Sequence, residues 1–220
     1  MSKKIGVILA GCGSRDGSEI HEATLTLYFL DRAGVETVCM APDRNQFHVI
    51  DHLHFQETGE TRNILTESAR IARGKIQDIN TVSAKDLDGL ILPGGTGAAK
   101  NLIDYNINKR NCMIHADVKR LILEIVKAGK PLGAICIAPM IVAVALRESG
   151  FHPLLTLGTE AEPASDIEFF GARHQNAQVD EIVVDDRLKI VSTPAYMLGP
   201  GISDIAKGIE KLVQKVVEMT

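Results

Sequence analysis

The stretch Pro131–Pro139 reads PLGAICIAP, an apolar run that meets a cysteine and then a proline. A continuous apolar run of this kind is typical of a strand buried on both faces, and Pro139 suits the first turn of a following helix. Ala134 and Ala138 flank Cys136 at two residues on either side, so strand and helix can meet in a sharp turn like a nucleophile elbow. The stretch therefore predicts a strand–turn–helix unit with Cys136 at the turn.

The same alternation of short apolar runs and helix-length segments extends along the chain. Strand-like runs lie at 4–10, 36–41, 87–93, 131–137 and 189–194, and helical patterns at about 19–33, 61–73, 114–129, 138–149 and 202–217. Apolar strands that alternate with helices indicate a mostly parallel sheet covered on both faces. We expect one α/β domain over residues 1–220, doubly wound and flavodoxin-like, with a small β-hairpin insertion whose turn is 185–188.

Composition excludes several classes of function. The 220 residues carry a net charge of −4 and are 4% aromatic with no Trp, so neither a basic stripe nor a stacking surface for nucleic acid is expected. The apolar runs are much shorter than the roughly 20 residues that cross a bilayer. No membrane segment is expected, and the cytoplasm is the default location. Four widely spaced cysteines without a CxxC pair indicate reduced thiols.

In open α/β sheets, functional groups gather beyond the carboxyl ends of the strands. At one such end, the helix dipole and unpaired N–H groups are expected to stabilise a Cys136 thiolate. The pattern is equally consistent with a small core cysteine between strand and helix. Cys12, Cys39 and Cys112 lack an elbow of this kind and are interpreted as structural.

A second strand exit, at 93–97, reads PGGTG. Gly94 and Gly95 allow close approach of the backbone and can aim N–H groups at an oxyanion, although a plain turn explains them equally well. The loop matches neither the P-loop pattern nor GxGxxG.

The first strand exit, residues 11–22, is rich in polar side chains. Asp16 and Ser18 are plausible helix caps and Glu19 a first-turn acid. Glu22 lies a turn further on, among apolar neighbours, so burial is expected to raise its pKa and let it hold a proton for a nearby thiol. A solvated first-turn acid is the alternative.

Three histidines, His48, His52 and His54, lie in a polar segment at 43–60. Two histidines four apart can share a metal ion, but no third and fourth ligand follows at an obvious spacing. Surface histidines without a metal are therefore the expectation.

The order of a helical Glu22, a PGG strand exit and an A-I-C-x-x-P elbow resembles the ThiJ/PfpI superfamily, which has the class I glutamine amidotransferase-like fold. Over nearly the whole chain, the segments KKIGVILAGCGSRDGSEIHEA, PGGTGAAKNL, GKPLGAICIAP and IVSTPAYML are similar to its enhancing lycopene biosynthesis (ElbB) branch.

This resemblance implies roles for particular residues. Cys136 falls on the nucleophile, Glu22 on the carboxyl group that hydrogen-bonds the thiol, and Gly94 and Gly95 on the loop that faces it, with Ile137 beside them. It also implies a glyoxalase III-type lyase, free of cofactor and metal, that converts a small 1,2-dicarbonyl such as glyoxal to glycolate. Related members are described as deglycases of glycated proteins, and a homodimer is expected. The alternatives are a redox-sensing thiol and a non-catalytic accessory protein of isoprenoid biosynthesis.

At three places the sequence differs from related groups of the superfamily, and these differences exclude some of the superfamily's activities. Ile137 stands where PfpI-type peptidases carry a histidine, and residues 192–200 contain no histidine for a glutaminase triad. Thr159 and Glu160 stand where many members place a histidine near the cysteine. Peptidase and glutaminase activities are therefore not expected, and the identity of a general base beyond Glu22 stays open.

Overall fold

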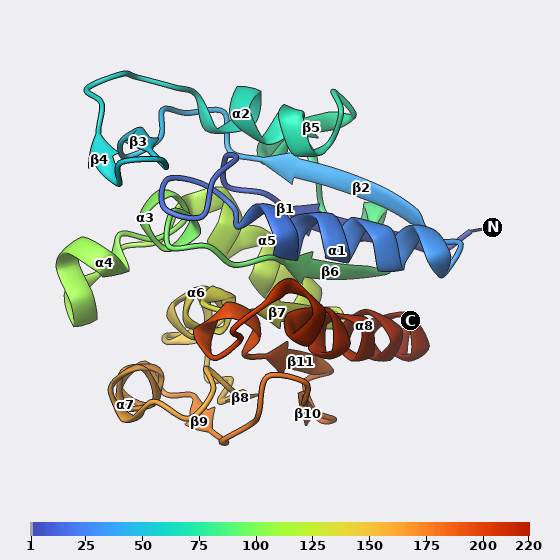
Figure 1. The fold of residues 1–220 in the computed structure, drawn as a ribbon. Coiled ribbons are helices and arrows are strands. Elements are labelled where there is room, and N and C mark those ends of the chain that lie inside the picture. Colours follow the sequence, from blue (N-terminus) through green and yellow to red (C-terminus); the bar gives the residue numbers. More distant parts are fainter. Residues whose placement is uncertain (1) are drawn as a thin grey trace.

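Strand β1 (Lys4–Ile8) lies inside the central sheet, and its last four residues are buried. The computed structural model describes residues 2–220, and in it seven strands pair in the order β10-β11-β7-β6-β1-β2-β5 (Figure 1). All pairings are parallel except that of β10 with β11. The other strands are β2 (Glu36–Ala41), β5 (Ile76–Asp78), β6 (Gly89–Leu92), β7 (Leu132–Ile135), β10 (Val183–Asp185) and β11 (Ile190–Thr193).

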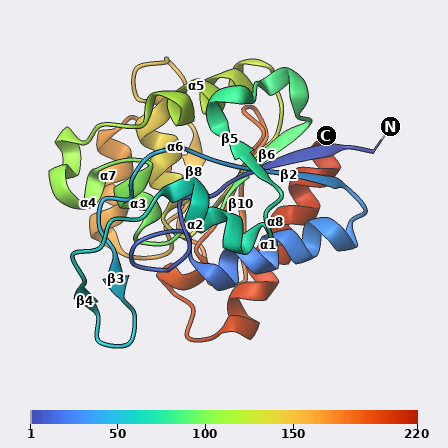
Figure 2. The same ribbon diagram turned by 90° about the horizontal axis from the view of Figure 1, so that it is seen from above.

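Helices cover both faces of this sheet, as the doubly wound prediction requires (Figures 1 and 2). On one face, apolar side chains of α1 (Ile20–Arg32), α2 (Ile64–Ile71) and α8 (Ile202–Met219) form one core. On the other face, α5 (Ala116–Lys127) and α6 (Ala138–Leu146) form the second core. Every residue of α6 is buried, which explains why its sequence is apolar all round. The predicted fold class is confirmed.

Shorter elements fill the connections. They are α3 (Ala98–Asn101), α4 (Tyr105–Asn108), α7 (Ala161–Phe169), the 3₁₀ turns η1 (Ile79–Thr81), η2 (Ala84–Asp86), η3 (Lys109–Asn111) and η4 (Ala195–Met197), and two small sheets made of β3 (Ile50–Asp51) with β4 (Gln56–Glu57) and β8 (Leu154–Leu155) with β9 (Arg173–His174). Within the described chain, no helix combines the length and the apolar character that crossing a membrane demands.

The predicted hairpin forms, but it is not an insertion. β10 pairs antiparallel with β11, and β11 is itself a strand of the main sheet, paired in parallel with β7. The hairpin therefore supplies the edge of the sheet. The hairpin that does project from the fold is β3–β4, within the polar segment 43–60 (Figure 1).

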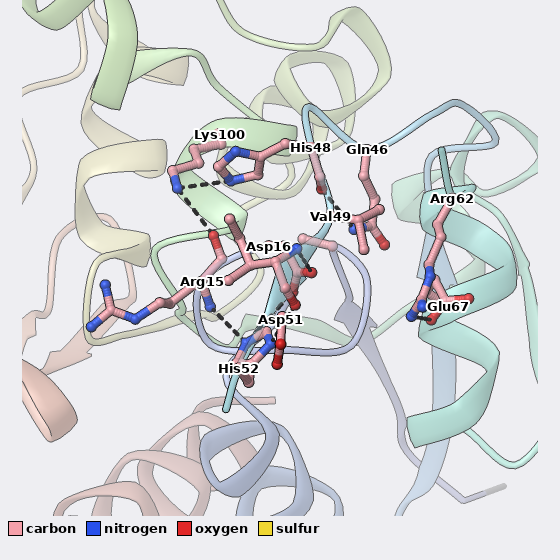
Figure 3. A network of polar contacts seen from close by, with 12 residues as sticks. Arg15, Asp16, Gln46, His48, Val49, Asp51, His52, Arg62, Glu67 and Lys100 are labelled. Atoms are coloured by element: carbon pink, nitrogen blue, oxygen red, sulfur yellow. Dashed lines mark hydrogen bonds and ion pairs between the residues drawn. The ribbon is translucent and has the colours of Figure 1, made fainter. Parts of the chain in front are cut away.

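The β3–β4 hairpin packs against loop 11–18, the connection between β1 and α1 (Figure 3). Asp16 is almost completely buried and accepts a hydrogen bond from the backbone N–H of Ile50 at 2.8 Å. Lys100 Nζ donates both to the carbonyl of Arg15, at 3.1 Å, and to Nε2 of His48, at 2.9 Å. The loop is thus held by β3 of the hairpin and by Lys100 of α3.

These contacts correct two expectations from the sequence. Neither Asp16 nor Ser18 caps α1, because Asp16 binds the hairpin and the Ser18 hydroxyl accepts from the N–H of Ala10 at 2.9 Å. Glu19 is the N-cap, and its carboxylate accepts from the N–H of Glu22 at 2.8 Å. His48 is not a surface residue either, since its side chain is only 10% exposed beneath Lys100.

Candidate active site

The stretch Pro131–Pro139 folds as the predicted strand–turn–helix unit. β7 ends at Ile135, α6 starts at Ala138, and Pro139 lies in the first turn of that helix. Between them Cys136 has φ of +61°, a conformation that non-glycine residues rarely adopt. The backbone N–H of Cys136 donates to the carbonyl of Thr193 at 2.9 Å, which holds the turn against β11. Strain of this kind persists only where the surroundings enforce it, and it concentrates at functional sites.

Glu22 lies beside Cys136 and is completely buried, as expected. Its Oε2 accepts from the N–H of Gly94 at 3.0 Å, and its Oε1 accepts from the N–H of Tyr196 at 3.3 Å. The carboxyl group also hydrogen-bonds the Cys136 thiol. The exits of β1, β6, β7 and β11 therefore meet around a single carboxyl–thiol pair.

The electrostatics of this pair differ from the expected thiolate. Burial, followed by the charge of Glu19, raises the pKa of Glu22 to about 8. Burial, followed by the negative charge of Glu22, raises the pKa of Cys136 well above its usual value, and hydrogen bonds from the N–H groups of Gly95 and Ile137 only partly oppose this. The helix N-terminus does not outweigh desolvation, because the cysteine is only 7% exposed. At neutral pH the resting pair is mostly protonated.

The glycine loop also differs in detail from the prediction. The N–H of Gly94 is occupied by Glu22, so it is not free to bind an oxyanion. The N–H groups of Gly95 and Ile137 are directed at the sulfur instead. Gly94 is required for another reason, since a Cβ there would lie 2.6 Å from Cβ of Cys136. Of the three residues expected at the oxyanion site, Gly95 and Ile137 direct their N–H groups at the sulfur, whereas the N–H of Gly94 binds Glu22.

A pocket of about 490 Å³ opens above the cysteine. Its lining consists of Ser14, Glu19, His21, Gly95, Thr96, Asn106, Cys136, Ile137, Tyr196 and Met197. Sequence reasoning missed His21, Tyr196 and Asn106. His21 directly precedes the predicted carboxyl residue, and Tyr196 follows the end of the predicted strand 189–194, so position along the chain could have indicated both. Nδ1 of His21 lies 2.8 Å from the hydroxyl of Tyr196.

The remaining candidate residues lie outside this pocket. His52 faces Asp16 at 3.6 Å, and His54 pairs with Asp51, so the three histidines do not converge on one point. Over residues 2–220, no group of three or more His, Cys, Asp or Glu side chains has the arrangement of a metal site. Cys39 and Cys112 are buried and Cys12 is partly exposed.

The raised pKa of Glu22 predicts a specific dependence of stability on pH. The folded protein keeps a proton that the unfolded chain releases between pH 4.5 and about 8. The free energy of unfolding is therefore expected to fall as pH rises through this window. Urea unfolding of a Glu22→Gln variant, measured at several pH values, should show a flatter dependence than that of the parent protein. The exposed Glu218→Gln variant serves as the control and should follow the parent, whereas parallel curves for parent and Glu22→Gln would contradict the assignment.

Comparison with known proteins places this geometry in a family. No protein-family model matches the chain. The human protein named glutamine amidotransferase-like class 1 domain-containing protein 3, mitochondrial, is 44% identical over 227 residues, which cover 99% of this chain and 83% of the human protein. The rat protein named ES1 protein homolog, mitochondrial, is 40% identical, with 99% of this chain and 84% of the rat protein covered.

Solved structures agree with these relatives. A crystal structure from Ehrlichia chaffeensis, described as an isoprenoid biosynthesis protein with an amidotransferase-like domain, is 38% identical with a TM-score of 0.91 and covers 99% of this chain and all of that one. Drosophila melanogaster DJ-1beta, at 21% identity and a TM-score of 0.54 over 100% of this chain and 96% of that one, shares the fold. The chain therefore belongs to the ES1 family of glutamine amidotransferase-like class 1 proteins.

Proposed function

We propose that the protein is a cofactor-independent glyoxalase that converts glyoxal, or another small 1,2-dicarbonyl, to the corresponding 2-hydroxy acid. The observation that carries this proposal is the buried contact between Cys136 and Glu22 at the floor of an open pocket. A thiol supplies a nucleophile for a carbonyl carbon, and a carboxyl group with a pKa of about 8 can both accept and return a proton near neutral pH.

The first step is addition of sulfur to one carbonyl. The ionised form of Glu22 takes the thiol proton as Sγ of Cys136 attacks, and a carbon–sulfur bond replaces the carbonyl π bond. The resulting alkoxide receives hydrogen bonds from the N–H groups of Gly95 and Ile137, which are already directed at the sulfur. Return of the proton from Glu22 gives a neutral hemithioacetal.

The second step moves hydrogen between the two carbons. Glu22 removes the proton from the carbon that carries sulfur and passes it to the oxygen of the neighbouring carbonyl, which gives an enediol. Glu22 then carries the hydroxyl proton of the sulfur-bearing carbon to the neighbouring carbon. One carbon is thereby oxidised to a thioester while the other is reduced to a primary alcohol, so no external oxidant or reductant is needed. Water then cleaves the thioester to glycolate and regenerates the Cys136 thiol.

Two other functions fit less well. An oxidation sensor would need an accessible thiol of low pKa, whereas Cys136 is buried and its pKa is raised. A role as an accessory protein in isoprenoid biosynthesis has one specific support, the description of the Ehrlichia chaffeensis protein. That role would be favoured if neither glyoxal nor larger dicarbonyls were consumed.

The compartment and the oligomeric state follow only as proposals. We place the protein in the cytoplasm, because its four free cysteines suit a reducing compartment. The names of the human and rat relatives place those proteins in mitochondria, whose matrix is also reducing. A homodimer and the absence of a nucleic-acid partner stay predictions.

The test is direct chemical analysis of the product. Purified parent protein, without added metal, nicotinamide or glutathione, should convert glyoxal to glycolate in a one-to-one ratio. Glycolate is measured by chromatography and the loss of glyoxal by derivatisation. Consumption of glyoxal without glycolate, as simple adduct formation on lysines would give, would contradict the proposal.

A further inference from the structure

The proposed chemistry ends in a thioester on Cys136, and its hydrolysis needs a base that activates water. Glu22 has another task in this step, because it hydrogen-bonds the sulfur that leaves and is therefore the group that supplies that sulfur with a proton. Thr159 and Glu160, which occupy the place of a histidine in related sequences, are exposed and do not line the pocket. The base must therefore be sought among the other residues of the pocket wall.

We propose that His21, held by the hydroxyl of Tyr196, is the general base that activates water for hydrolysis of the Cys136 thioester. This inference rests on the proposed function and extends it to a residue of the same pocket. His21 and Cys136 both line the cavity of about 490 Å³, so a water molecule can lie between imidazole and thioester. The position of His21 on α1 also favours this role, since His21 directly precedes Glu22, which contacts the sulfur.

Tyr196 links the two titratable groups. Its backbone N–H donates to Oε1 of Glu22 at 3.3 Å, while its side-chain hydroxyl lies 2.8 Å from Nδ1 of His21. When Nδ1 donates its hydrogen to this hydroxyl, the lone pair of Nε2 is free to accept a proton from water. The two rings pack with centroids 5.9 Å apart, which restricts rotation of the imidazole. Tyr196 thus acts as a positioning residue for His21.

Backbone geometry keeps Tyr196 in this place. The preceding residue, Ala195, is completely buried and has φ of +43°, so the chain turns sharply at the exit of β11. This turn directs the N–H of Tyr196 toward Glu22 while the side chain reaches the pocket wall. Cys136 and Ala195, both with positive φ, therefore follow the ends of the adjacent strands β7 and β11, and Cys136 and Tyr196 contact the same carboxyl group.

The hydrolytic step balances without a further reactant. Water oxygen bonds to the thioester carbonyl carbon as its proton passes to Nε2 of His21. Collapse of the tetrahedral intermediate, whose oxyanion binds the N–H groups of Gly95 and Ile137, breaks the carbon–sulfur bond. The carboxyl proton of the new acid passes through Glu22 to the leaving sulfur, which restores the thiol. The product leaves as glycolate, and His21 releases the other proton of the water molecule to solvent.

The experiment is acid quenching of the reaction followed by intact-mass analysis of the protein. A hemithioacetal reverts when the protein unfolds, whereas a thioester survives acid and is cleaved by hydroxylamine. In His21→Gln, steady-state turnover of glyoxal should fall about 100-fold, the lower end of the range for general bases. A hydroxylamine-sensitive adduct with the mass of one glyoxal should accumulate in this variant. Hydroxylamine added after free glyoxal has been removed should release the adduct as the hydroxamate of glycolate.

Matched variants separate a catalytic role from a structural one. Tyr196→Phe removes only the hydroxyl and should accumulate the same adduct with a smaller loss of turnover, because the imidazole remains but is no longer held. His152→Gln, at an exposed histidine bonded to the carbonyl of Gly171 and outside the pocket, should behave as the parent. His21 is itself exposed, so its replacement should leave the unfolding temperature unchanged.

The possible outcomes also separate the two proposals. If the parent forms glycolate and His21→Gln does so at the same rate without an adduct, the role of His21 is overturned while the glyoxalase proposal stands. If the adduct accumulates instead in Glu19→Gln, the other carboxylate of the pocket wall is the base. If the parent forms neither glycolate nor a thioester, the proposed function itself is wrong.

Discussion

A Cys136→Ser variant is expected to lose at least about 1,000-fold of kcat/KM for glyoxal, as removal of an essential nucleophile does in other enzymes. Exchange of sulfur for oxygen is nearly isosteric, so the elbow, the contact with Glu22 and the two N–H donors should persist. A carboxylate with a pKa of about 8, however, is far too weak a base to ionise a serine hydroxyl. The loss should therefore appear in kcat, with the fold unchanged.

Controls for this prediction come from the other cysteines. Cys39 is buried in β2, away from the pocket, and burial raises the pKa of its thiol to about 11. Cys39→Ser should keep parental turnover, measured as glycolate formed per active protein, even if its unfolding temperature falls. Equal rates for Cys136→Ser and the parent, with unfolding temperatures also equal, would rule out covalent catalysis at this residue.

A Gly97→Ala variant is expected to lose roughly 3 kcal/mol or more of stability, the upper part of the range for overpacking a close contact. A Cβ at residue 97 would lie 1.9 Å from the backbone N of Gly17 and 2.2 Å from the carbonyl carbon of Asp16. Both atoms belong to backbone, which cannot rotate away as a side chain can. Loop 11–18 would have to move away from residues 93–97. Ser14, which lines the pocket, would move with this loop.

Gly201→Ala is the matched control for this substitution. Gly201 also precedes a helix, its φ of −156° suits any residue, and the nearest atom to an added Cβ is Oδ2 of Asp204 at 3.6 Å. Its free energy of unfolding should change by no more than about 0.5 kcal/mol, as is usual for surface positions. Urea denaturation of both variants measures the difference. Equal urea midpoints for Gly97→Ala and Gly201→Ala would show that loop 11–18 can move without lowering the free energy of unfolding.

The parts of the site that the sequence predicts are those that local patterns encode. The elbow at Cys136 depends on neighbouring small residues and a proline, and the burial of Glu22 depends on the apolar residues around it in α1. Each pattern lies within a few residues of the group it positions. The alternation of strands and helices is local in the same sense, which explains why the fold class is predictable.

The parts that the sequence does not predict depend on which distant groups meet. Nothing near Gly94 indicates that its N–H binds Glu22, 72 residues away. The role of Tyr196 also depends on the pairing of β11 with β7, which brings its backbone to the same carboxyl group. The failure to predict a protonated Cys136 has a related cause, because desolvation is a property of the assembled core and outweighs the local helix dipole.

The strand order has a consequence for how the protein acquires its activity. The pocket takes residues from the exits of β1, β6, β7 and β11, four neighbouring strands that are far apart along the chain. Parallel pairings of this kind close long loops, and chains dominated by such non-local contacts fold slowly. A partly folded chain that lacks β11 would have its cysteine but not the backbone N–H of Tyr196 that fixes Glu22. During refolding, turnover should therefore recover more slowly than the helical circular dichroism signal. The Cys136 thiol is expected to be inactive until β11 has paired with β7.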